Sequence, residues 1–370
     1  MTKELTVLKT EAAGCRRCES LPPQISGPGT LHLQFPLGHS MGKILTLARE
    51  AGWEYSRQDG LLSIAIDSPD LAPTVLPLCK NLTATEQEDV RVLFQSEGQL
   101  LQWQSGFEVD SLRTFAARSQ SGWLISLLDE KRLDTWFQPI VECADPTQVF
   151  AYECLMRGSE NGQLVFPDRI LNVAKGAGLL FQLDRAARVT SIHNAAKFGL
   201  QSKIFINFTP TAIYDPVNCL QTTVKAVDEC GLKREQVVFE VIESEQVNDP
   251  NFLRDILNFY REQGFGVALD DIGSGYSSLN LLNQIRPDYI KLDRELSTGV
   301  HDDHYKGLIA AKLLEVAREL EIPTIAEGVE TVEEFEWLRD HGADYVQGYL
   351  FARPATPPPV PARIEMLVAG

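Results

Sequence analysis

Short apolar runs alternate with longer amphipathic stretches from Trp136 to the end of the chain. The apolar runs predict strands, and apolar residues spaced three or four apart predict helices between them. The predicted strands are Phe137–Val141, Val149–Leu155, Ile204–Phe208, Val237–Ile242, Val267–Leu269, Tyr289–Leu292, Thr324–Ala326 and Tyr345–Tyr349. The predicted helices include Leu183–Phe198, Cys219–Cys230, Phe252–Gln263, Lys306–Leu320 and Val332–His341.

Strands separated by helices indicate βα units and an α/β fold with a mostly parallel sheet. About eight such strands in roughly 235 residues is the size of a (βα)₈ TIM-type barrel. A doubly wound open sheet is the alternative. Its dinucleotide-binding version is disfavoured, because no Gly-x-Gly-x-x-Gly motif follows the first strands.

The first hundred residues have a different pattern and predict a smaller α/β or α+β module over residues 1–100. We expect strands at Leu31–Phe35 and Leu61–Ile66. Helices are expected at Ser40–Ala51, before Gly52, and at Leu71–Leu82. The position of this module suggests a sensory or regulatory role, and its sequence does not identify a fold family.

Apolar and charged residues recur at helical spacing from 107 to 131, which predicts one or two connecting helices. We therefore divide the chain into the module at 1–100, a helical linker at 101–121 and a catalytic domain at 122–365. The linker would carry a signal from the module to the domain, although an inert helix fits the same pattern.

The charge and the apolar pattern exclude several classes of function. A net charge of -17 argues against binding to DNA or to an anionic membrane. Met1 to Gly14 do not resemble a signal peptide, and no segment reaches the ~18 apolar residues of a spanning helix. We therefore expect a cytoplasmic protein.

The 7 cysteines are scattered, which fits a reducing compartment better than a disulfide framework. Cys15 and Cys18 form one Cys-x-x-Cys pair. This pair could be half of a zinc site, with His32 or His39 as remote ligands, or a redox pair. Two reduced cysteines without a ligand are the simpler alternative, because no second Cys-x-x-Cys is present.

Asp270 and Asp271 directly follow the apolar run at 267–269, and a turn with Gly273 and Gly275 follows them. Adjacent carboxylates at a strand end repel each other unless a cation lies between them. Taken alone, the pair is more typical of a solvated acidic turn than of a divalent metal site.

Polar residues at the other strand ends favour the metal site. They are Glu153, Asn207, Glu240, Lys291, Glu327 and Gln347, with Arg157 and Glu243 nearby. Active sites of (βα)₈ barrels lie at this end of the strands. An all-oxygen set suits Mg²⁺ or Mn²⁺ better than zinc. The number of carboxylates favours two ions, which suits phosphoryl transfer, and Arg157 and Lys291 suit phosphate oxygens or a reacting water.

The segment from Glu153 to Arg157, Glu-Cys-Leu-Met-Arg, resembles the motif that names the EAL family of cyclic-di-GMP phosphodiesterases. Later segments match in order: Asn207, Glu240-Val-Ile-Glu243, Asp270-Asp271-Ile-Gly-Ser-Gly, Lys291-Leu-Asp293, Glu327-Gly-Val-Glu330 and Gln347-Gly-Tyr. The resemblance covers residues 122–365. It implies a modified barrel with an antiparallel first strand, and a homodimer formed through the EAL domain beside the Asp-Asp loop.

The resemblance also implies a role for each matching residue. One metal ion would be held by Glu153, Asn207, Glu240 and Asp270, and a second by Asp270, Asp271 and Glu327. Lys291 would orient or deprotonate the attacking water, and Glu243 would fix the loop from Asp271 to Gly275. The substrate-binding set would be Gln138, Leu155, Arg157, Asp184, Asp293, Glu330 and Gln347, with Arg157 on a phosphate and Gln138 and Asp184 on guanine.

Several residues depart from the family pattern. Cys154 stands in place of alanine, Met156 and Gly158 in place of leucine and tryptophan, Ile272 and Ser274 in place of phenylalanine and threonine, and Lys175 in place of an acidic residue. These changes leave every metal-ligand position and Lys291 intact. They bear on loop stability, dimer coupling and rate.

The first hypothesis is therefore hydrolysis of cyclic-di-GMP to linear pGpG with Mg²⁺ or Mn²⁺, regulated by an unknown signal or protein at the amino-terminal module. A catalytically silent EAL domain, acting as a nucleotide receptor or protein-binding regulator, is the second. Another two-metal barrel hydrolase is the third. Synthesis of the dinucleotide is not expected, because the chain has no diguanylate cyclase signature.

Overall fold

The computed structural model describes residues 20–99, 109–213, 216–242, 250–273 and 278–361. The described chain forms two compact units. One contains residues 133–157 and everything described from 184 onward, and the other contains residues 20–132 and 158–183. Cys15, Cys18, Glu243 and Ser274 lie outside the described residues.

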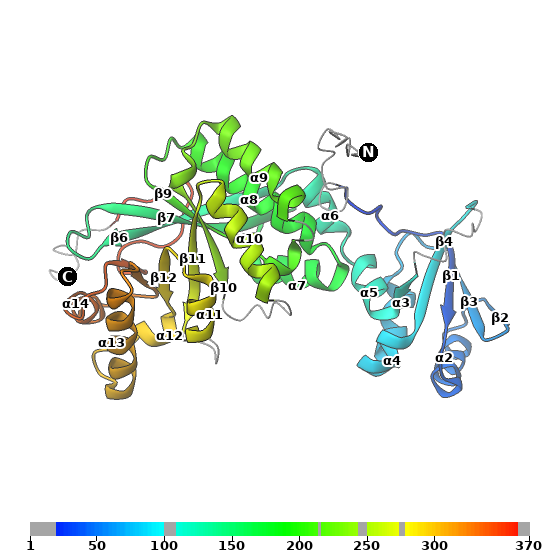
Figure 1. The fold of residues 1–370 in the computed structure, drawn as a ribbon. Helices are drawn as coiled ribbons and strands as arrows, with labels where there is room; N and C mark the ends of the chain where they lie inside the picture. The colour runs from blue at the N-terminus through cyan, green and yellow to red at the C-terminus, as the bar shows by residue number, and fades with distance from the viewer. Residues whose placement is uncertain (1–19, 100–108, 214–215, 243–249, 274–277, 362–370) are drawn as a thin grey trace, which may run out of the picture. The chain divides into compact units, whose positions relative to one another are not determined.

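The first unit is a closed barrel of eight strands (Figure 1). They are β6 (Leu133–Glu142), β7 (Val149–Glu160), β9 (Lys203–Asn207), β10 (Val237–Ile242), β11 (Gly266–Ile272), β12 (Tyr289–Leu292), β13 (Thr324–Ala326) and β14 (Tyr345–Gln347). Strands β7, β9, β10, β11, β12, β13 and β14 pair in parallel, whereas β6 pairs with β14 in antiparallel orientation. The pairing of β6 with β7 closes the ring, so the predicted barrel with an antiparallel first strand is confirmed.

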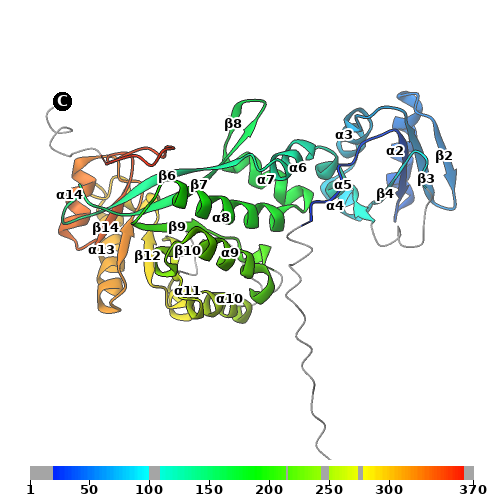
Figure 2. The same ribbon diagram turned by 90° about the horizontal axis from the view of Figure 1, so that it is seen from above.

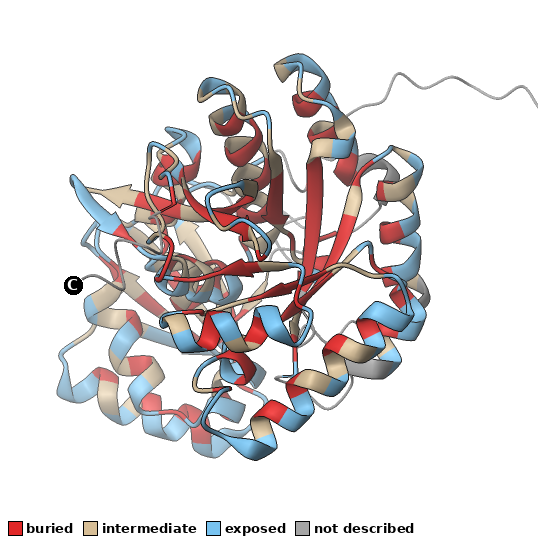
Figure 3. Ribbon diagram, turned by 90° about the vertical axis from the view of Figure 1, so that its left-hand side faces the viewer, coloured by how far each residue is buried: buried red, intermediate tan, exposed pale blue. Residues whose placement is uncertain are grey.

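Helices connect these strands, and the strands themselves are largely buried (Figure 3). The helical elements are α8 (Leu180–Lys197), η2 (Pro210–Ala212), α9 (Pro216–Cys230), η3 (Arg234–Gln236), α10 (Pro250–Glu262), α11 (Ser278–Ile285), α12 (Arg294–Ser297), α13 (His304–Glu319) and α14 (Val332–Asp340). All five predicted helices are present with slightly shifted ends. The short α11 and α12 were not predicted, because segments of this length carry too few turns for a clear helical period.

The second unit contains an antiparallel five-stranded sheet (Figure 2). Its strands are β1 (Gly29–Gln34), β2 (Tyr55–Gln58), β3 (Leu61–Ile66), β4 (Arg91–Ser96) and β5 (Asp110–Ser111). Its helices are α2 (Gly38–Glu50), α3 (Ala72–Lys80), α4 (Ala84–Asp89), α5 (Leu112–Ser119), α6 (Gly122–Asp129) and α7 (Pro167–Ala177), and β8 (Gln163–Val165) pairs with the end of β7.

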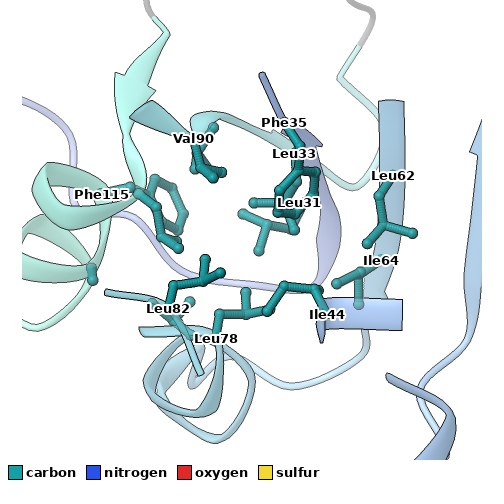
Figure 4. Packing of buried hydrophobic residues seen from close by; sticks show 14 of the residues in the cluster. Leu31, Leu33, Phe35, Ile44, Leu62, Ile64, Leu78, Leu82, Val90 and Phe115 are labelled. Carbon is teal, nitrogen blue, oxygen red and sulfur yellow. The ribbon is translucent and has the colours of Figure 1, made fainter. Parts of the chain in front are cut away.

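The sheet order β2-β3-β1-β4 gives this module the split βαβ arrangement of ferredoxin-like folds. Alternate residues of β1 and β3 point into a core against α2 and α3, including Leu31, Leu33 and Ile64 (Figure 4). The predicted strands and helices of the module are confirmed. Strands β2, β4 and β5 and helix α4 were missed, since polar residues in these short segments obscure the period.

The predicted connecting helices correspond to α5 and α6. Both pack against α7, which belongs to the same unit as the amino-terminal sheet. Residues 122–132 and 158–183 are thus structurally part of that unit. Among the described residues, each helix is too short or too polar to cross a lipid bilayer.

Candidate active site

Most of the predicted site residues form one layer inside the barrel. The apolar layer beside it contains Ile140, Ala151, Phe205, Val238, Ala268 and Ile325, with Tyr289 and Tyr345 packed against it. Side chains two positions apart point to the same face of a strand. Two positions further along the parallel strands come Glu153, Asn207, Glu240, Asp270, Lys291, Glu327 and Gln347. Gln138 precedes Ile140 by two positions, because β6 runs in the opposite direction.

Asp271 reaches the same site through a β-bulge. The register of β11 against β12 shifts between Leu269 and Ile272, which inserts one extra residue into β11. Asp271 adopts a left-handed backbone with φ 58°, and its amide N–H donates to Asp270 Oδ1 at 3.0 Å. One carboxylate oxygen from each of Asp270, Asp271 and Glu327 therefore lies within 4.8 Å of the others. The predicted strand ended at Leu269 because a bulge leaves no periodic signal.

Lys291 is fully buried at the centre of the carboxylates. Its Nζ lies 2.6 Å from Glu240 Oε1 and 2.5 Å from Glu327 Oε1. It also lies 3.2 Å from Asp270 Oδ1 and 3.8 Å from Glu153 Oε2. One ammonium thus compensates part of the negative charge that four carboxylates bring into the barrel.

The pKa values of this layer are strongly shifted. Burial raises the pKa of Glu240 and of Glu327 well above the ordinary value, and Lys291 only partly offsets this. Burial and then the charge of Asp270 raise the pKa of Asp271 to about 7. For Lys291, burial lowers the pKa, but the surrounding carboxylates outweigh it and raise the pKa well above 10.5. Lys291 alone therefore cannot keep all carboxylates of this layer ionised, and a further cation is needed to do so.

This donor set fits divalent cations. Glu240 Oε2 is buried and accepts no hydrogen bond from the described residues. Asp270, Asp271 and Glu327 offer three converging oxygens. Carboxylate and amide oxygens are the ligands that Mg²⁺ and Mn²⁺ prefer, so the predicted cation chemistry matches the geometry.

Glu153 is held by two amides. Asn207 Nδ2 donates to Oε1 at 3.1 Å, and Gln347 Nε2 donates to Oε2 at 2.6 Å. Gln347 Nε2 also lies 3.1 Å from Gln138 Oε1, and Gln138 Nε2 donates to the carbonyl of Ala352 at 3.3 Å. This network links Glu153 to the residue predicted to contact guanine, and it fixes both side chains before any ligand binds.

A cavity of about 160 Å³ opens beside this layer. Its lining contains the predicted residues Gln138, Glu153, Glu327, Glu330 and Gln347. It also contains four residues that sequence reasoning did not assign: Arg294, Gly328, Gly348 and Tyr349. Arg294 directly follows the Lys-Leu-Asp segment and Tyr349 closes Gln-Gly-Tyr, so their positions beside assigned motifs were the available signal.

The remaining predicted substrate-binding residues lie outside this cavity lining. Arg157 is 8% exposed, with its guanidinium 5.1 Å above the ring of Trp136, and burial lowers its pKa. Leu155 is half-buried on β7, and Asp293 caps α12 by accepting from the N–H of Glu295 at 2.6 Å. The buried Asp184 pairs with Arg188 and accepts from the N–H of Thr209 at 2.8 Å.

For two residues that depart from the family pattern, Gly158 and Ile272, the structure shows how the position is packed. Gly158 is buried, and a Cβ there would lie 2.8 Å from Leu127 Cδ1 and 3.0 Å from Ile170 Cδ1. The neighbouring side chains therefore occupy the space that a tryptophan would need. Ile272 is 2% exposed at the end of β11, so it contributes to packing beside the two aspartates.

A model of the family described as the EAL domain matches residues 122–354 of this 370-residue chain. The match covers more than half of the chain. This protein belongs to the EAL domain family. The EAL match includes every residue of the carboxylate layer.

Two curated relatives of this chain are named as phosphodiesterases. A protein of Escherichia coli K12 named probable cyclic di-GMP phosphodiesterase PdeG is 33% identical over 60% of this chain and 44% of its own length. Cyclic di-GMP phosphodiesterase NbdA of Pseudomonas aeruginosa is 31% identical over 61% of this chain and 29% of its own. The chain thus spans less than half the length of these relatives.

A solved structure of an EAL protein also resembles this chain. A standalone EAL protein from Vibrio cholerae, in its c-di-GMP-bound form, is 37% identical with a TM-score of 0.57. The alignment covers 62% of this chain and 95% of that protein. This likeness supports the barrel assignment independently of the sequence motifs.

Proposed function

We propose that this protein hydrolyses cyclic-di-GMP to linear pGpG in a reaction that depends on Mg²⁺ or Mn²⁺. The observation that carries the proposal is the complete layer of Glu153, Asn207, Glu240, Asp270, Asp271, Lys291 and Glu327 around one end of the barrel. The names of the curated relatives and the ligand of the Vibrio structure support cyclic-di-GMP as the substrate.

Two ions would be held by two overlapping sets of ligand residues in this layer. The first set is Glu153, Asn207, Glu240 and Asp270, and the second is Asp270, Asp271 and Glu327. When bound, the ions supply positive charge that activates water and stabilises the charge of the reacting phosphate. Asp270 belongs to both sets, and Asp271 can join the second set because the bulge in β11 directs both carboxylates to the same end of the barrel.

In this reaction the oxygen of water forms a bond to phosphorus, and the bond from phosphorus to the 3′ oxygen breaks. The 3′ oxygen takes up a proton, and the ring opens to pGpG. Lys291 Nζ lies among Glu240, Asp270 and Glu327, and from this position it would orient or deprotonate the attacking water. The side-chain amides of Asn207 and Gln347 hold the carboxylate of Glu153 in position to bind the first ion.

The substrate would lie over the cavity beside this layer. Gln138 would contact guanine, and Gln347 and Glu330 would line the cavity around the sugar and phosphate. Arg157 would bind a phosphate, with Leu155, Asp184 and Asp293 completing the predicted set. Asp184 already contacts Arg188 through one oxygen and the N–H of Thr209 through the other, and each oxygen retains a lone pair that can accept from guanine.

We further propose that the protein forms a homodimer through its EAL domain. Helix α13 comes after β12, the strand beside β11, and bears the exposed apolar residues Tyr305, Leu308, Ile309 and Val316 along one side, with the exposed Leu320 directly after its end. Exposed apolar residues gathered on one face of a protein favour an interaction site. A dimer formed there would couple this helix to the neighbouring strands that carry Lys291 and Asp271.

The amino-terminal module would regulate this activity in response to a signal or partner protein. Helices α5 and α6 connect the module to the start of β6, and both pack on α7, which follows β7 and β8 in the chain. A change in the module can therefore act on segments that flank the strand carrying Glu153.

Metal removal tests the proposed reaction. Protein treated with EDTA is expected to release no pGpG from cyclic-di-GMP, and added Mg²⁺ or Mn²⁺ is expected to restore the product on chromatography. Nucleotide binding without turnover in the presence of either ion would instead support a catalytically silent receptor.

A further inference from the structure

Arg294 is the cationic residue among the nine described residues that line the cavity. Three glutamates share that lining: Glu153, Glu327 and Glu330. Lys291 lies beneath them and is fully buried in contact with carboxylates. A substrate phosphate that lies away from the carboxylate layer would thus meet Arg294 as its positively charged partner in this cavity.

The backbone around Arg294 fixes the start of its side chain. Arg294 is the first residue of α12, directly after the capping residue Asp293. Its stem packs on Gly328, where a Cβ would lie 2.4 Å from Arg294 Cγ and 2.7 Å from its Cβ. Gly328 has φ +69°, so glycine allows both the backbone turn and this close approach.

The guanidinium itself remains available to a ligand. Its Nη2 lies 3.6 Å from Glu330 Oε1, and the two side chains are 64% and 43% exposed. An exposed ion pair at this distance contributes little to folding stability. A phosphodiester can replace Glu330 as the partner, because guanidinium groups bind phosphate oxygens through charge-assisted hydrogen bonds.

Cyclic-di-GMP carries two phosphodiesters, each with one negative charge, and only one is cleaved in each ring-opening step. We propose that Arg294 binds the phosphodiester that is not cleaved, and so contributes to selectivity for a dinucleotide with two phosphates. The inference rests on the proposed function for the identity of the substrate. A purely structural Arg294–Glu330 pair would instead leave substrate affinity unchanged.

The test compares Arg294→Gln with wild type in the full chain. We expect the KM for cyclic-di-GMP to rise about tenfold, the loss of roughly one charge-assisted contact, with kcat within about twofold. Arg294→Lys should recover part of the affinity, since it keeps the charge. The inhibition constant of linear GpG, which has a single phosphodiester, should change much less than the KM.

Arg339→Gln is the matched control, because Arg339 pairs with Asp340 at 2.9 Å on α14 and is not part of the cavity lining. It should leave the KM unchanged, and thermal unfolding checks that each variant is folded. An unchanged KM in Arg294→Gln would overturn the inference, as would an equal loss of affinity for GpG and cyclic-di-GMP.

A separate result would show that the proposed function is wrong: wild-type protein would then convert no cyclic-di-GMP with either Mg²⁺ or Mn²⁺. Arg294 is then tested by calorimetric binding of cyclic-di-GMP in EDTA. Binding about tenfold weaker in Arg294→Gln would still support the contact, and equal binding would refute it.

Discussion

Glu240 and Glu86 are both buried glutamates, but their surroundings move the pKa in opposite directions. Glu240 lies among other carboxylates, and burial raises its pKa well above the ordinary value. Glu86 accepts hydrogen bonds from Lys43 at 2.9 Å, from the Thr83 N–H at 2.8 Å and from Ser40 at 2.8 Å. These donors, Lys43 foremost, lower the pKa of Glu86 to about 2. Glu240 therefore suits cation binding, whereas Glu86 stabilises the fold.

The lowered pKa of Glu86 predicts a pH-dependent contribution to stability. A carboxylate whose pKa falls from 4.5 to about 2 on folding stabilises the protein above pH 4.5, and loses that contribution as the pH falls through about 2. Glu86→Gln should therefore lower the Tm at pH 7, and the Tm difference from wild type should narrow below pH 4.5. A difference that stays constant down to pH 2.5 would contradict this account.

Residue types at strand ends carried most of the information about the site. Glu153, Asn207, Glu240 and Lys291 were predictable because period-two alternation fixes the face of each side chain. Asp271 is different, since its direction depends on a bulge and a left-handed backbone that the sequence pattern does not reveal. Arg294 was missed because its place in the cavity depends on packing against Gly328, 34 residues away in the chain.

At the scale of elements, β7 has two different environments along its length. Its first part supplies Glu153 to the barrel layer, while Gly158 near its end is packed between α6 and α7. Long apolar strands and helices were predicted well, since their period is repeated several times. Strand β8 was missed because it forms a short β-hairpin with the end of β7, and the hairpin depends on a turn at Asn161 and Gly162 and not on a long apolar run. Helix α7, which follows this hairpin, was missed as well.

Close packing at Gly158 predicts that even one added methyl group destabilises the second unit. In Gly158→Ala the new Cβ would lie 2.8 Å from Leu127 Cδ1, so the free energy of unfolding should fall by about 1–3 kcal/mol. Gly42→Ala is the matched control on α2, where a Cβ meets nothing within 4 Å. It should stabilise the unit by about 0.5–1 kcal/mol, because alanine favours the helix interior.

Denaturant unfolding of the two alanine variants measures both effects. Equal stability of Gly158→Ala and wild type would show that α6 and α7 move apart easily, and would remove this explanation for the glycine at position 158.

At the scale of the whole molecule, the described chain combines an EAL barrel with a ferredoxin-like module. The α/β class of the barrel follows from local periods, whereas the ferredoxin-like sheet order of the module depends on strand pairing and the assignment of residues 158–183 to the second unit depends on tertiary contacts of α7. The division into functional segments at 1–100, 101–121 and 122–365 stays a prediction.

The apolar side of α13 predicts the assembly state. Ile309 is 51% exposed, and Ile309→Glu should convert a dimer to a monomer, since a buried interface charge without a partner is costly. Light scattering coupled to size-exclusion chromatography measures the mass. Leu76→Glu is the control, because Leu76 is a 38% exposed leucine on α3 in the other unit. A wild-type monomer, or a dimer that persists in Ile309→Glu, would exclude α13 as the interface.

The central claim is that the carboxylate layer makes this EAL domain an active phosphodiesterase. The most direct measurement is chromatography of cyclic-di-GMP after incubation with pure full-length protein and Mg²⁺ or Mn²⁺, alongside Glu153→Ala. The account predicts that pGpG accumulates with wild type and falls at least about 100-fold with Glu153→Ala, because a metal ligand is lost. No pGpG from wild type with either ion, or equal product from both proteins, would contradict it.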